Sequence, residues 1–146
     1  MQNLITRLKI KSEDNILVIN DKINLLQVLY QYSIRTFDKY LQITHPDSVI
    51  IFLQNISDID TYMSEYINNL YNHTHILRIC YPKQASGIYT DTARNQISKY
   101  MIEKYSLTWV RVISLNEEYS AFEFTKINQN FTKIKSPNNV YSSSLT

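Results

Sequence analysis

The sequence predicts an α/β fold: an open, mostly parallel sheet of about five or six strands with helices on both faces. Short apolar runs typical of buried strands alternate with longer segments in which apolar residues recur at helical spacing. The last two strand-like runs follow each other directly, which predicts a C-terminal antiparallel hairpin. The chain has 146 residues, of which 44% are hydrophobic, and this is enough for one ordinary core.

The predicted strands share a short apolar run that ends at polar residues or at a turn. In chain order they are residues 15–20, 48–53, 75–81, 107–113 and 119–125, with a weaker candidate at 40–43. Because right-handed crossovers join parallel strands, the side of the sheet that each helix covers is set by the chain order. The closing hairpin is expected to add an antiparallel edge strand.

The predicted helices have the apolar spacing of helices that pack one face on a sheet. They are residues 23–32, a segment that begins at Ser57 or Asp58, and a segment that begins near Thr90 or Asp91. Each of these four residues can cap a helix, because its side-chain oxygen can accept from an early backbone N–H.

The helix and strand pattern ends after Ile127, which predicts one α/β domain over residues 1–127. Residues 128–146 are polar and are expected to form a flexible C-terminal tail. From Lys126 onward the chain has three lysines and no acidic residue, so weak contact with an acidic partner is an alternative to simple solvation.

Composition limits the classes of partner and compartment. The net charge of +2 is too small to indicate a nucleic-acid partner. No apolar run reaches the length of a membrane helix, and the N-terminus lacks the apolar core of a signal peptide. A cytoplasmic protein is therefore expected. Cys80, the single cysteine, lies in an apolar run and is predicted to be a small buried core residue.

The loop after the strand at 75–81 is the densest cluster of chemically distinctive residues. In an open parallel sheet, ligands bind beyond the carboxyl ends of the strands, and this loop leaves such an end. Pro82 is expected to end the strand because it lacks an N–H. Gly87 is the only glycine of the chain, which indicates a need for positive φ or for close approach of backbone.

The loop and its edge of the sheet are interpreted as a ligand-binding site for a small anion. The candidate residues are Lys83, Ser86, Gly87, Thr90, Asp91, Arg94 and Asn20. Lys83 and Arg94 would supply positive charge, and Ser86 and Thr90 hydroxyl donors, beside the N–H groups of a helix N-terminus. The alternative is structural: Asp91 caps the helix, Gly87 permits a turn, and the two basic side chains pair with Asp91 or with water.

Standard cofactor and metal sites are not indicated. A dinucleotide or S-adenosylmethionine site would place a Gly-x-Gly turn after the first strand, where Asn20 and Asp21 stand instead. His73 and His75 lack nearby cysteine or carboxylate ligands, so they make a poor metal site. Neither a cofactor nor a metal is predicted.

The stretch from Ile79 to Phe124 resembles a family of small bacterial proteins classified as a domain of unknown function. That family has the signature Tyr-Pro-Lys-x-x-Ser-Gly-x-x-Thr-Asp followed by an arginine. It is matched here by Tyr81, Pro82, Lys83, Ser86, Gly87, Thr90, Asp91 and Arg94. The family's closing strand resembles Tyr119–Phe124, with Tyr119 where tryptophan is usual and Glu123 where a basic residue is frequent.

The order of elements also resembles a trimmed class I methyltransferase sheet, including the final hairpin. This resemblance implies a degenerate methyltransferase-like, Rossmann-like fold whose cofactor site is absent or rebuilt. A fold alone does not determine a function.

Two functions remain open on these grounds, and the first is favoured. In the first, the chain is a non-catalytic domain that contacts a small anion or a protein partner through the loop after Tyr81. Alternatively, it is an enzyme for a phosphorylated or carboxylated small substrate, with Lys83 and Asp91 in the site. Nucleic-acid binding ranks below both.

Overall fold

Six strands form one sheet, in the order β2-β1-β3-β4-β6-β5. The computed structural model describes residues 2–43, 45–53, 55, 57–70, 76–83 and 94–126. The strands are β1 (Asn15–Ile19), β2 (Arg35–Phe37), β3 (Ser48–Phe52), β4 (Ile76–Pro82), β5 (Leu107–Ser114) and β6 (Tyr119–Lys126). The first four run parallel, whereas β6 is antiparallel to both β4 and β5. The α/β class, the mostly parallel sheet and the closing hairpin are confirmed.

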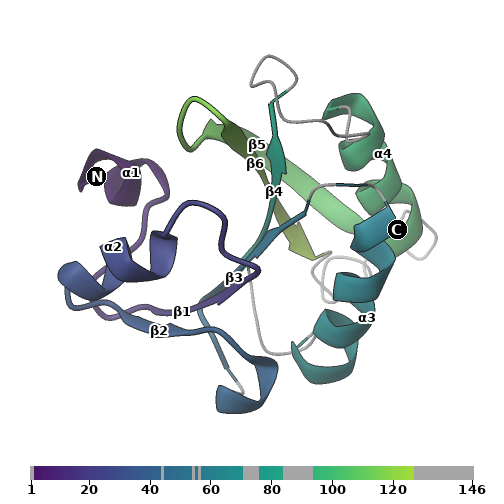
Figure 1. The fold of residues 1–146 in the computed structure, drawn as a ribbon. Helices are drawn as coiled ribbons and strands as arrows, with labels where there is room; N and C mark the ends of the chain where they lie inside the picture. The colour runs from purple at the N-terminus through teal and green to yellow at the C-terminus, as the bar shows by residue number, and fades with distance from the viewer. Residues whose placement is uncertain are drawn as a thin grey trace, which may run out of the picture.

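Helices cover both faces of the sheet. They are α1 (Gln2–Arg7), α2 (Leu25–Gln31), α3 (Ser57–Leu70) and α4 (Arg94–Tyr105), with a short 3-10 helix η1 at Tyr40–Gln42. Figure 1 shows α1 and α2 on one side of the sheet and α3 and α4 on the other. None of the helices in the described ranges is long and apolar enough to cross a membrane.

The sheet separates two apolar cores. Along β3, Val49 and Ile51 pack in the core beneath α3 and α4, whereas Ile50 and Phe52 pack in the core beneath α1 and α2. All four side chains are almost completely buried. Because successive residues of a strand point to opposite faces, a central parallel strand needs apolar residues at every position. This explains why β3 reads as a continuous apolar run.

Four details differ from the sequence prediction. The weak strand candidate at 40–43 is wrong, because residues 40–42 form the 3-10 helix η1. The second strand is instead β2, which has only three residues and gives little periodic signal. Helix α1 was not predicted. The last strand of the hairpin, β6, is not the edge strand that the sequence predicts, because it lies between β4 and β5 and leaves β5 at the edge of the sheet.

Helix α1 is tied to the far part of the sheet by buried charges. Arg78 on β4 donates to Glu123 on β6 at 2.9 Å and to the carbonyl of Leu8 at 2.6 Å. Arg111 on β5 donates to the same carboxylate at 2.9 Å and to the carbonyl of Arg7 at 2.8 Å. Two guanidinium groups that share one carboxylate therefore hold the carbonyls of Arg7, the last residue of α1, and of Leu8, which follows it.

Candidate functional site

The candidate site lies at the edge of the sheet where β1, β3 and β4 end. After β1 the chain goes to β2 on one side, and after β2 it returns to β3 on the other side. The strand order thus reverses between β1 and β3, which is where open α/β sheets form their ligand crevice. Asn20 follows β1, Leu53 follows β3 and Lys83 follows β4.

Asn20 joins the ends of the first two of these strands. Its backbone has a φ of 59°, a left-handed conformation that asparagine tolerates better than most residues. Its side-chain amide donates to the carbonyl of Phe52 at 2.9 Å. The side chain thus bridges β1 and β3. Asn20, which the sequence analysis names as a ligand-binding candidate, therefore also contributes to the structure of the sheet edge.

The carboxylate of Asp21 fills the turn between β1 and α2. One oxygen accepts from the backbone N–H groups of Ile23 and Leu25, both at 3.0 Å. The other accepts from the N–H of Leu26 at 2.9 Å. Asn24, the residue at the start of α2, makes no side-chain capping bond, so Asp21 takes that role. The sequence places Asp21 on this edge but does not indicate this function.

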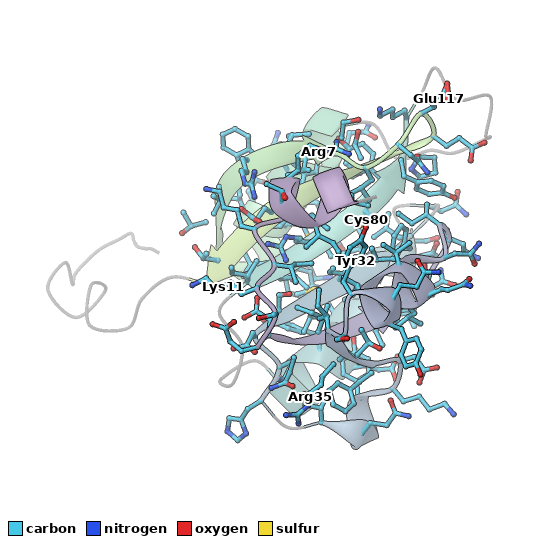
Figure 2. All side chains as sticks on the ribbon, turned by 90° about the vertical axis from the view of Figure 1, so that its left-hand side faces the viewer. Arg7, Lys11, Tyr32, Arg35, Cys80 and Glu117 are labelled. Atoms are coloured by element: carbon cyan, nitrogen blue, oxygen red, sulfur yellow. The ribbon has the colours of Figure 1, made fainter. Side chains whose placement is uncertain are left out.

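Lys83 contacts the turn between β5 and β6. Its ammonium group donates to Ser114 Oγ at 2.7 Å and to the carbonyl of Asn116 at 2.6 Å. Its backbone N–H donates to the carbonyl of Glu118 at 2.8 Å. Figure 2 shows Glu117 at the tip of this hairpin. Lys83 therefore reaches towards β5 and β6, whereas Asn20 contacts β3 on the other side of β4.

The remaining candidate residues lie outside the described part of the chain. These are Ser86, Gly87, Thr90 and Asp91, together with the side chain of Arg94. His73, His75 and the tail at 128–146 also lie outside it. The anion site proposed from the sequence thus remains a prediction. Within the described ranges, no group of three or more His, Cys, Asp or Glu side chains could hold a metal ion.

Cys80 is a core residue, as predicted. It lies in the core beneath α1 and α2 and is 1% exposed. Burial raises the pKa of its thiol, because the charged thiolate loses its water. A thiol of this kind stays protonated and is a poor nucleophile.

The comparisons with known proteins establish the fold. No protein-family model matches the sequence, and no curated protein does. The 16S rRNA methylase ArmA has a similar structure, with a TM-score of 0.55 and 12% identity over 86% of this chain and 80% of that one. An uncharacterised protein from Listeria monocytogenes serotype 4b has a TM-score of 0.54 and 9% identity over 99% of this chain and 71% of that one.

The fold is methyltransferase-like. At 9% and 12% identity, the likeness extends to the fold and not to the activity. The methyltransferase-like sheet identifies the edge at which a ligand would be sought. At that edge, Asp21 accepts from backbone N–H groups at the start of α2, and Lys83 donates to the β5–β6 turn.

Proposed function

We propose that this chain is a cytoplasmic binding domain on a degenerate methyltransferase-like sheet. It contacts a small anion or a partner protein through residues 84–93, the loop after β4. The single observation that carries this proposal is the position of Asp21. Cofactor-binding sheets keep a glycine-rich turn after the first strand so that backbone N–H groups can approach the cofactor. Here a carboxylate of the chain accepts from three of those N–H groups.

The contacts of Lys83 support a binding domain over an enzyme. A lysine that acts as a nucleophile or as a general base needs a free, neutral amine at the reacting centre. The ammonium of Lys83 instead donates to a hydroxyl and a carbonyl of the β5–β6 turn. These bonds fix Lys83, the residue that precedes residues 84–93. The resemblance of residues 81–94 to the signature of the bacterial family also favours a contact loop.

Titration calorimetry with S-adenosylmethionine tests the proposal most directly. We expect no saturable heat at S-adenosylmethionine concentrations up to about 1 mM. Any binding would then have a Kd above about 1 mM, which corresponds to a binding free energy weaker than about 4 kcal/mol. Saturable binding in the micromolar range would contradict the proposal, because it would show that the cofactor displaces or bypasses the Asp21 carboxylate.

Two further measurements identify what the loop contacts. For the anion, pyrophosphate should raise the melting temperature of the native chain and should do so less in the variant Arg94→Gln. For a protein, a photo-crosslinker at Gln84 should give defined products that a crosslinker at Glu13 does not give. Glu13 is exposed and precedes β1, at the opposite edge of the sheet. The proposal is contradicted if Arg94→Gln does not reduce the effect of pyrophosphate and if the crosslinker at Gln84 gives no products that differ from those at Glu13.

Nucleic acid is not part of the proposal, although ArmA is by its name an rRNA methylase. The charge of +2 over 146 residues gives little electrostatic attraction for phosphates. We expect no salt-dependent binding to a 16S rRNA fragment in fluorescence anisotropy. A steep salt dependence would instead favour an RNA-binding role.

A further inference from the structure

A groove lies beside α2 and β2, at the edge of the sheet opposite β5. Its main hollow has a volume of about 770 Å³ and is lined by the last turn of α2, from Tyr30, and by β2 itself. A second hollow of about 380 Å³ shares Tyr30, Thr36 and Phe37 with the first and continues to Asp38 and Gln42. The two hollows together follow the whole length of the strand, so the groove suits an elongated ligand better than a compact one.

β2 ends the sheet on this side. Within the described residues it pairs with β1 alone, through Arg35, Thr36 and Phe37. The side of β2 that faces away from β1 therefore presents backbone N–H and C=O groups along the groove. An extended peptide can use such an edge by adding to the sheet as one more strand.

The side chains around the groove define the chemistry of the ligand. Tyr30, which lines both hollows, is 77% exposed. Exposed tyrosines of this kind are frequent anchors at interfaces, because the ring offers a large contact area at a low cost in side-chain entropy. Arg35 is the one charged residue among those that line the main hollow, and Figure 2 shows it at the edge of the molecule opposite Glu117.

We propose that this groove binds an extended segment of a partner protein, which adds to the sheet beside β2. The segment packs an apolar or aromatic side chain on Tyr30 and places a carboxylate against Arg35. Because β2 has only three residues, the added strand gains few backbone hydrogen bonds. The contacts with Tyr30 and Arg35 therefore supply much of the affinity and the choice of sequence.

Selection from a phage library of random peptides tests this proposal. The native chain should enrich peptides that combine an acidic residue with an apolar or aromatic residue. The variant Arg35→Glu should instead enrich peptides with a basic residue, because its charge is reversed. Tyr30→Ser should weaken the selected peptides at least about tenfold, the loss that removal of an interface anchor causes.

Matched controls lie at other exposed sites. Trp109→Ser removes an aromatic side chain that is 47% exposed on β5, the opposite edge strand. Lys99→Glu reverses an exposed charge on α4. Both should bind the selected peptides as the native chain does, and circular dichroism should confirm that all four variants are folded.

Hydrogen exchange locates the bound peptide. Addition of a strand should slow the exchange of backbone amides in β2 and leave those of β5 unchanged. The proposal is overturned if Tyr30→Ser and Arg35→Glu bind the selected peptides as tightly as the native chain, or if protection appears elsewhere. It is also overturned if sedimentation shows a dimer that Tyr30→Ser and Arg35→Glu dissociate, because a second copy of the chain then covers β2. These outcomes concern β2, so they leave the proposal for the loop after β4 unaffected.

Discussion

Within the ranges that the structure describes, the backbone reaches positive φ at five residues that are not glycine. They are Lys9, Asn20, Asn24, Ser33 and Ser106, with φ between 54° and 60°. A chain with one glycine is expected to reserve it for such a position, and this singles out Gly87 in the sequence. This chain, however, places Lys, Ser and Asn where glycine is usual, so positive φ does not by itself require Gly87. What Gly87 does remains a prediction.

Two of these residues end helices in the same way. After α2, Ser33 N–H donates to the carbonyl of Tyr30 and Ile34 N–H to that of Leu29. Ile34 and Leu29 are also buried in one core. This is the Schellman arrangement, in which a residue with positive φ closes the helix and an apolar pair covers the turn. Lys9 ends α1 in the same arrangement.

Replacement of Ser33 by glycine should stabilise the protein. A left-handed conformation costs an L-residue about 1–2 kcal/mol, and the greater freedom of glycine in the unfolded chain offsets roughly half of that gain. We expect the free energy of unfolding in urea to rise by about 0.5–1 kcal/mol. Ser64→Gly, in an exposed position within α3, should have the opposite sign. A loss of stability at both positions would contradict this explanation.

Asp21 should be important for stability because it replaces the missing cap of α2. Asp21→Ala leaves three backbone N–H groups without their acceptor, and we expect a loss of about 1–3 kcal/mol in urea unfolding. Asp14 offers a matched control, since its carboxylate accepts one backbone N–H, from Lys11. Asp14→Ala should cost less than Asp21→Ala, and equal losses would argue against the capping role.

At the scale of elements, α3 and α4 are joined by a cluster around Asp60. Its carboxylate accepts from Tyr100 Oη at 2.6 Å, from Lys104 Nζ at 3.0 Å and from the hydroxyl of Tyr105. Lys104 Nζ also lies 5.3 Å from the centre of the Tyr100 ring. The hydrogen bonds from Tyr100 and Tyr105 are the main cause that lowers the pKa of Asp60 to about 2.

Because the folded pKa of Asp60 lies below its ordinary value of 3.8, its contribution to stability is present above pH 3.8 and is lost as the pH falls towards 2. The carboxylate is 48% exposed, so solvent screening limits this contribution to about 1 kcal/mol or less. The native chain should be more stable than Asp60→Asn in urea at about pH 6, and this difference should shrink towards pH 2. A difference that is independent of pH would show that the charge of Asp60 contributes nothing.

At the scale of the whole molecule, the sequence predicts the strands of the sheet better than their order. β3 and β6 are recognised because burial leaves a continuous or alternating apolar pattern. The insertion of β6 between β4 and β5 depends on contacts far apart in the chain, such as Arg78 with Glu123, which local periodicity does not encode. β2 and α1 are too short for a periodic pattern to appear.

The candidate site is predictable only in part for a similar reason. The carboxyl edge follows from the alternation of strands and helices, so Asn20 and Lys83 are correctly placed on it. Their hydrogen bonds do not follow, because Asn20 contacts Phe52 and Lys83 contacts Ser114, each more than thirty residues away. A lysine in a loop suggests a free charge, and only the fold brings the β5–β6 turn within its reach.

The pair of arginines around Glu123 gives the most demanding test of how the molecule is held together. Glu123 is 5% exposed and Arg78 is 2% exposed, so Glu123→Gln leaves two guanidinium groups at this site without a counter-charge. Loss of one partner of a buried ion pair costs about 3–5 kcal/mol, and we expect urea unfolding to show a loss of this size. Lys104→Met, which breaks the exposed pair with Asp60, should cost much less, because solvent screens an exposed pair. If Glu123→Gln costs no more stability than Lys104→Met, the carbonyls of Arg7 and Leu8, at the end of α1, are sufficient to hold the two arginines without the carboxylate.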